Sequence, residues 1–367
     1  MNLLSRGRSP RCSIRSSVSS RRLTRRTALP AAVLGAVLLT GCAACTSGSA
    51  AAPTKPATGP VALRPQYVAL AEAVAAHGAQ AWVEADLIKA WVTGPERYAS
   101  ALDAVVKLAD RKGVAGVKIA DELGYQDGTD ATTVMAFLTA TTRALHERLP
   151  GRKVVVDLIV PELGCLSWSG VPEAVAGAGS ADGRRMCGAA EVARNPAVAL
   201  TAVDGYIAKG GLDVVDLSAG LRTDAEYAGW GTTRDAAMAA AWDEASRRWG
   251  KDVRLQARKA LAHPGRYDGT KESAEADVRT YVDIPLAHGA HAVDIWTWSQ
   301  PYKGGTYTLT DPGLAPNDLT RALLERRRRG VELWTHMTPS SLQVGLEQDV
   351  ASAVSIFSGV LVASGTG

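Results

Sequence analysis

From residue 65 onward, amphipathic helical patterns alternate with short runs rich in β-branched residues, and this alternation constrains the fold more than any other feature. Glycines follow several of the helical patterns, as C-cap glycines do. Strands that alternate with helices at this spacing predict a parallel sheet with crossover helices. We predict clear strands at 81–87, 114–121, 153–160, 212–217, 253–258 and 292–298, a seventh at 331–334, and either a strand or part of a C-terminal helix at 354–363.

The predicted strands share an asymmetry that favours a closed barrel over an open sheet. Val156 and Leu158, for example, flank Asp157, and a similar alternation continues in the other strands. Because side chains alternate across a strand, each strand has one apolar face for the helices and one polar or aromatic face. Strands buried in an open doubly wound sheet are apolar on both faces. Six strands with a polar face need a common polar interior, so we predict an α/β fold of the (β/α)8 type, a TIM barrel of seven to eight strands.

The first 41 residues have the pattern of an export signal. They carry eight arginines and no acidic residue, so the formal net charge of +4 comes from this segment and the rest of the chain is slightly acidic. An apolar run at 28–39 is too short to span a bilayer as a mature helix. It leads into Leu39-Thr40-Gly41-Cys42, which resembles a bacterial lipobox. We therefore expect a lipoprotein signal peptide, cleaved before a lipidated Cys42; an ordinary secretory signal is the alternative.

This reading predicts four segments. Residues 1–41 are the signal peptide, which is removed, and 42–60 form a lipidated tether whose Ser/Ala/Pro/Gly composition has nothing to bury. Residues 61–340 form the barrel, and 341–367 form a C-terminal element that packs on it. We expect the protein on the outer face of the cytoplasmic membrane, held there by the lipid on Cys42. Paired arginines leave open whether export uses the general or the twin-arginine pathway.

Two of the five cysteines remain for the folded body. Cys165 and Cys187 lie in the irregular stretch 161–195, whereas the other three lie in the leader, at the lipidation position and in the tether. Disulfides persist in exported proteins, so we predict that these two pair. By the chain-entropy model, closing such a loop contributes roughly 3 kcal/mol. Two free thiols are the alternative, and a zinc site is not expected because the loop has no histidine.

The polar strand faces supply side chains that suit sugar chemistry. Cleavage of a glycosidic bond needs one protonated carboxyl to protonate the leaving oxygen and one carboxylate to attack or to activate water. The flat apolar faces of sugar rings stack on tryptophan, and their hydroxyls bond to Asp, Arg and Gln. The predicted substrate-binding residues are Trp82, Glu84, Asp86, Lys118, Gln256, Arg258, Asp294, Trp296 and Trp298.

Two segments carry a resemblance to the glycoside hydrolase (β/α)8 superfamily, which extends over residues 80–336. They are Val117-Lys118-Ile119-Ala120-Asp121-Glu122-Leu123-Gly124-Tyr125 and Asp294-Ile295-Trp296-Thr297-Trp298. An acidic pair at the C-terminal end of a strand and a late strand bearing tryptophans are common in that superfamily. No single family within it matches. The resemblance implies a glycosidase that takes a carbohydrate substrate.

Three acids are the predicted catalytic residues. Glu122 is expected to be the general acid, because at the rim of the barrel an apolar neighbourhood would raise its pKa. Asp157 or Asp216 is then the base or nucleophile, from neighbouring strands. A structural ion pair is the alternative for each acid taken alone. Among the histidines, His263 follows a strand and could join the site.

The alternative function is a non-catalytic carbohydrate-binding lipoprotein, either a degenerate barrel or a solute receptor. The chain has no H-x-H, H-E-x-x-H, G-x-S-x-G or Walker motif, so no cofactor or metal is expected. The net charge of the chain is much lower than is typical of a nucleic-acid-binding protein, so no nucleic-acid partner is expected. A content of 46% hydrophobic and 21% charged residues excludes disorder and fibrous structure. We expect a monomer.

Overall fold

The computed structural model describes residues 61–125, 128–169 and 180–363. The expected signal peptide, the tether and the lipidation position Cys42 lie outside these residues. Within the described part of the chain, no helix combines the length and the hydropathy needed to cross a membrane.

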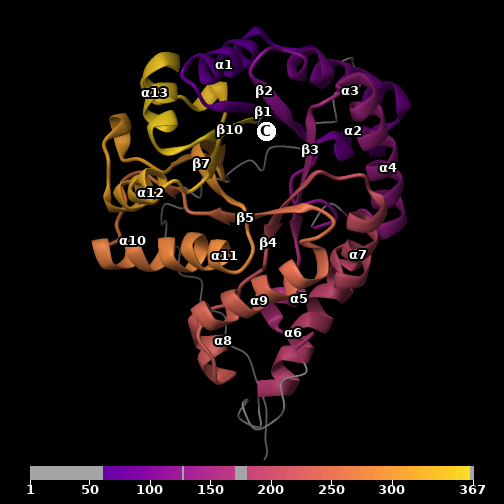
Figure 1. The fold of residues 1–367 in the computed structure, drawn as a ribbon, viewed down its shortest axis with the longest axis vertical. Coiled ribbons are helices and arrows are strands. Elements are labelled where there is room, and N and C mark those ends of the chain that lie inside the picture. The colour runs from indigo at the N-terminus through magenta and orange to yellow at the C-terminus, as the bar shows by residue number, and fades with distance from the viewer. Residues whose placement is uncertain (1–60, 126–127, 170–179, 364–367) are drawn as a thin grey trace, which may run out of the picture. The chain divides into compact units, whose positions relative to one another are not determined.

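Eight parallel strands close into a barrel (Figure 1). Around the barrel their order is β1-β2-β3-β4-β5-β7-β9-β10, and β10 pairs with β1, so no barrel strand has a free edge. The predicted TIM barrel is confirmed. The barrel strands are β1(Gln80–Glu84), β2(Val114–Lys118), β3(Lys153–Ile159), β4(Val214–Ser218), β5(Arg254–Ala260), β7(Ala292–Tyr302), β9(Leu333–Met337) and β10(Gly359–Ala363).

Helices surround the barrel, and the outward faces of the strands pack against them. Capping residues mark the N-termini of several of these helices. For example, the Asp130 carboxylate caps α4 by accepting hydrogen bonds from the backbone N–H groups of Thr132 and Thr133. The helices are α1(Pro65–Ala76), α2(Leu87–Thr93), α3(Pro95–Ala109), α4(Ala131–Arg148), α5(Pro161–Cys165), α6(Ser180–Arg194), α7(Leu200–Lys209), α8(Asp224–Gly229), α9(Arg234–Trp249), α10(Lys271–Val278), α11(Ile284–Ala287), α12(Asp318–Arg328) and α13(Leu346–Ile356).

The interior of the barrel has an apolar lower half. There the rings of Trp82 and Trp334 lie 4.3 Å apart between their centroids. They form a separate buried cluster with Val155, Val214, Ala292 and Leu361. Except for Leu361, these residues precede polar inward positions on their strands. The apolar layer therefore lies toward the N-terminal ends of the strands and the polar layer toward the C-terminal ends.

The C-terminal segment differs from its expected role. Residues 341–367 were expected to pack on the barrel, but β10 pairs with both β1 and β9 and is itself the eighth strand. All five residues of β10 are buried. A short, continuously apolar run cannot be told from a buried helix by its periodicity, and this strand carries no inward acid to mark it.

Two additional segments extend beyond the C-terminal ends of the barrel strands. After β3, α5 and α6 are joined by a disulfide between Cys165 and Cys187, with their Cα atoms 5.7 Å apart, which confirms the predicted pairing. After the barrel portion of β7, the strand continues into a hairpin with β8(Gly305–Thr308), and β6(His263–Pro264) pairs with the other edge of β8.

Candidate active site

Lys118 of β2 lies at the centre of the polar upper interior and has no exposed surface. Burial lowers the pKa of Lys118, but the surrounding carboxylates outweigh burial and hold it well above the usual value. The ammonium therefore compensates several buried acids from different strands. Its Nζ lies 3.2 Å from Asp216, 3.5 Å from Asp157, 3.7 Å from Asp294, 3.8 Å from Glu84 and 3.8 Å from Asp121.

Arg258 of β5 spans the mouth of the barrel above this layer. Its Nε lies 2.8 Å from Asp157 Oδ2, its Nη2 donates to Asp121 Oδ1 at 3.0 Å, and its Nη1 donates to Glu122 Oε1 at 3.2 Å. The side chain of Asp157 is fully buried, whereas 47% of the Asp121 side chain is exposed. The guanidinium thus connects a buried carboxyl to one at the solvent boundary.

Asp121 and Asp157 form a carboxyl pair whose pKa values are driven apart. Burial raises the pKa of Asp157 to about 8, although Arg258 and Lys118 oppose the shift. Burial also tends to raise the pKa of Asp121, but the positive charges of Arg258 and Lys118 outweigh this effect and lower the pKa. The neighbouring Asp121 also raises the pKa of Asp157. At neutral pH one member is protonated and the other ionised, which is the arrangement that acid–base catalysis uses.

A second carboxyl pair lies deeper in the same layer. Burial and the neighbouring Asp294 raise the pKa of Asp216 well above its usual value. Burial also opposes ionisation of Asp294, but His336 and Lys118 outweigh it and lower the pKa of that carboxyl. Both side chains are almost completely buried. Substrate would reach this pair only after passing the mouth.

His336 of β9 is a site residue that the sequence reasoning missed. Its Nε2 lies 2.6 Å from Asp294 and its Nδ1 lies 2.7 Å from Glu84. Burial opposes the charge, yet these two carboxylates raise the pKa of His336 to about 9. The predicted strand stopped at residue 334, whereas β9 runs to Met337. Continuing the alternation from Trp334 by two residues would have placed His336 inward.

His263, which could join the site by its position after a strand, makes its contacts elsewhere. It lies on β6, where its Nε2 is 3.4 Å from Asn317 Nδ2 and its ring lies beside Tyr267. Neither contact belongs to the Lys118 network.

Trp82 and Trp298 lie outside the polar layer, and Asp86 lies beyond the end of its strand. Trp82 packs against Trp334 in the apolar lower half of the barrel. Trp298 is fully buried in the outer core, because the register of β7 shifts between Ile295 and Ser299 and ends the simple alternation. Asp86 follows the end of β1 at the N-terminus of α2 and pairs with Lys89 at 2.6 Å.

Glu122 lies at the mouth as expected, but its surroundings differ from the prediction. An apolar neighbourhood was expected, and the Arg258 guanidinium is found 3.2 Å away. The side chain of Glu122 is 35% exposed. Glu122 as the general acid stays a prediction, in surroundings that are more polar than expected.

The remaining predicted residues come together in the upper barrel, and Gln256 is the most informative of them. Gln256 is fully buried and lies in register beside Asp216, yet neither atom of its amide has a hydrogen-bond partner among the described residues. Buried amides are normally paired, so an unpaired one inside this layer indicates a place for a ligand or solvent. The residues brought together are Glu84, Lys118, Asp157, Asp216, Gln256, Arg258, Asp294 and Trp296.

One trio in the described part of the chain has the spacing of a metal site. Asp216, Asp294 and His336 bring one ligand atom each to within 4.8 Å of one another. The Lys118 ammonium already faces both carboxylates, and both nitrogens of His336 are bonded to carboxylates. A protonated imidazole has no lone pair for a cation. We therefore assign the trio to the ion-pair network.

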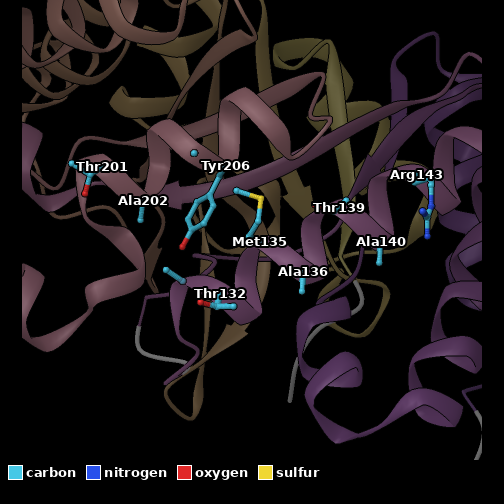
Figure 2. A pocket seen from close by; sticks show the side chains of 11 residues that line it. Thr132, Met135, Ala136, Thr139, Ala140, Arg143, Thr201, Ala202 and Tyr206 are labelled. Atoms are coloured by element: carbon cyan, nitrogen blue, oxygen red, sulfur yellow. The ribbon is translucent and has the colours of Figure 1, made fainter.

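Two hollows lie outside this network. A groove of about 660 Å³ lies on the outer layer between α4 and α7, where Met135 and Tyr206 lie among small side chains (Figure 2). A second hollow of about 630 Å³, lined in part by Trp82, Trp334 and Lys153, lies at the N-terminal ends of the strands. Neither contains a member of the carboxyl pairs.

Stability should fall as the pH rises through the range in which these groups titrate. The pKa of Asp157 rises from 3.8 to about 8 and that of His336 from 6.5 to about 9, so the folded state holds both protons longer than the unfolded chain. Stability therefore declines between about pH 4 and 8 through Asp157, and between about pH 6.5 and 9 through His336.

We expect the melting temperature of the wild-type protein to be lower at pH 9.5 than at pH 7. In the His336→Gln variant, the melting temperature should decrease less over that interval. Circular dichroism melts from pH 6 to pH 10 would measure both slopes. Equal slopes for the variant and the wild-type protein would contradict this role of His336.

Comparison with known proteins identifies no family. No known family matches the chain by sequence, and no curated protein matches it. Among solved structures, it is similar to a protein from Burkholderia cenocepacia described as a phosphonomutase, with a TM-score of 0.40, 14% identity and coverage of 82% of this chain and 91% of that one. Xylanase B from Clostridium stercorarium has a TM-score of 0.40, 12% identity and coverage of 80% and 88%.

A β-1,4-D-mannanase from Cryptopygus antarcticus is also similar, with a TM-score of 0.37, 11% identity and coverage of 77% of this chain and 83% of that one. The similar structures thus include glycoside hydrolases and other barrel enzymes. Values this low do not favour one reaction over another.

Proposed function

We propose that this protein hydrolyses glycosidic bonds at the C-terminal mouth of its barrel. The observation that carries the proposal is the Asp121–Asp157 pair, in which Arg258 joins a buried, protonated carboxyl to a carboxylate at the solvent boundary. Asp157 protonates the leaving oxygen, the neighbouring Asp121 helps to keep the proton on Asp157, and a carboxylate farther across the mouth attacks the sugar or activates water. This assignment replaces Glu122 as the acid and leaves Glu122 to hold Arg258 in place.

The charge of the whole network supports the same reaction. Three cationic side chains, Lys118, Arg258 and His336, face more acids than they can neutralise. Even with Asp157 and Asp216 protonated, negative charge remains in excess. Fixed negative charge in a buried site stabilises the positive charge that develops on the sugar during glycosidic cleavage. The six acids are Glu84, Asp121, Glu122, Asp157, Asp216 and Asp294.

A glycan panel tests the reaction. We would incubate the wild-type protein and the Asp157→Asn variant with polysaccharides and aryl glycosides and measure released reducing ends or aglycone. Turnover by the wild-type protein and its loss in the variant support the proposal. Sugar binding by both without turnover by either would favour the non-catalytic, degenerate-barrel alternative. The two-lobed solute receptor is not supported by a closed barrel.

We also propose that the protein is exported and anchored by a lipid on Cys42. The support is the basic leader, the apolar run and the Leu39-Thr40-Gly41-Cys42 sequence, together with a disulfide that suits an oxidising compartment. Mass spectrometry of the mature protein is expected to find a modified Cys42 at the N-terminus. A free amine on any other first residue would contradict the anchor.

A further inference from the structure

The β7–β8 hairpin carries an aromatic wall that begins at the mouth of the barrel. Trp296 follows Asp294 by two residues on the same inward face of β7 and is partly exposed. Tyr302 and Tyr307 lie on one face of the hairpin beyond it, because Gln300 is paired with Tyr307 and Tyr302 follows Gln300 by two residues. The ring centroids of the three aromatic residues lie 5.2 to 5.9 Å apart.

Several contacts hold this wall in place. The Trp296 indole N–H donates to Gln300 Oε1 at 2.6 Å, and the Lys303 ammonium lies 4.9 Å from the centre of the Tyr302 ring. The far edge of β8 is paired with β6, so the hairpin is one part of a three-stranded antiparallel extension. Even so, 43% of Tyr302 remains exposed. A held aromatic ring that faces solvent is typical of a recognition surface.

We infer that this aromatic wall binds further sugar units of a glycan chain, so that the substrate is an oligosaccharide or polysaccharide and not a simple glycoside. The inference rests on the proposed function, because Trp296 is the link between the wall and the carboxyl pair. Aromatic faces bordered by the Tyr hydroxyls and the Gln300 amide match a sugar ring, which has an apolar face and hydroxyls at its edge. Since Tyr302 lies on the hairpin, beyond the barrel part of β7, affinity should increase with chain length.

The Tyr302→Ala variant tests the wall with substrates of different length. We would measure kcat/KM on an aryl monoglycoside and on a hexasaccharide of the same sugar. The ratio of the hexasaccharide value to the monoglycoside value should fall about tenfold in the variant, which corresponds to the loss of one good contact. Tyr302→Phe keeps the ring and should keep the wild-type ratio. Val92→Ala, at an exposed apolar residue of α2, is the matched control.

Affinity electrophoresis in gels containing soluble xylan, glucomannan or mixed-linkage β-glucan separates this inference from the proposed reaction. Retardation of the wild-type protein that is lost in Tyr302→Ala and kept in Tyr302→Phe supports the wall, whether or not turnover is found. Turnover by the wild-type protein with an unchanged ratio in Tyr302→Ala would overturn the wall and leave the reaction standing. Absence of both retardation and chain-length dependence would also overturn it.

Discussion

Replacing Lys118 with methionine is expected to lower the free energy of unfolding by about 3–5 kcal/mol at pH 7. Methionine fills a similar volume but carries no charge, so several carboxylates would lose the cation within 4 Å of them. Removing one partner from a buried ionic network leaves uncompensated charge, which costs more than the pair itself contributes. Urea unfolding followed by tryptophan fluorescence would measure the change.

The Lys153→Met variant is the matched control for this experiment. Lys153 begins β3 and pairs with Asp213 at 2.9 Å, but its side chain is 59% exposed. Surface pairs contribute about 0–1 kcal/mol, so this variant should be nearly as stable as the wild-type protein. The deficit of Lys118→Met should also shrink toward pH 5, because protonation of the carboxyls removes the repulsion. Equal losses in the two lysine variants would contradict the central position of Lys118.

Replacing Asp157 with asparagine is expected to reduce turnover of a natural glycan by about 10²–10⁴-fold, the usual contribution of general acid–base catalysis. Asparagine keeps the size of the side chain but has no acidic proton for the leaving oxygen. An aryl glycoside with a good leaving group needs less protonation, so its turnover should fall less. A uniform loss on both substrates would indicate a structural role for Asp157.

The pH dependence of the wild-type reaction provides a second measure of the same role. Because the pKa of Asp157 is about 8, kcat/KM should fall as the pH rises above 8 and the acid loses its proton. Asp103→Asn, which changes an exposed ion pair with Arg148, serves as the control and should leave the profile unchanged. An alkaline limb that persists unaltered in Asp157→Asn would assign it to another group.

Much of the barrel could be predicted from residue alternation. The strands bearing Asp157, Asp216 and Asp294 alternate apolar and polar side chains, and that pattern is local to each strand. Prediction failed where the pattern was interrupted. The register of β7 shifts before Ser299, and β10 has no inward polar residue at all.

The roles of the site residues depend on contacts between strands, which alternation along one strand does not predict. Sequence reasoning found Lys118, Asp157 and Arg258 as inward residues, but it expected an apolar neighbourhood around Glu122 and missed His336. Those errors concern neighbours and not residue types. Glu122 meets a guanidinium from β5, and His336 lies between carboxylates from β1 and β7.

The sequence by itself determined a barrel with a polar interior, because side-chain alternation along a strand depends only on nearby residues. Only the tertiary structure decided which carboxyl keeps its proton. A pKa depends on burial and on charges within a few ångströms, and here those charges come from distant parts of the chain. Lys118 and Asp216, for instance, are 98 residues apart in the sequence and 3.2 Å apart in the site.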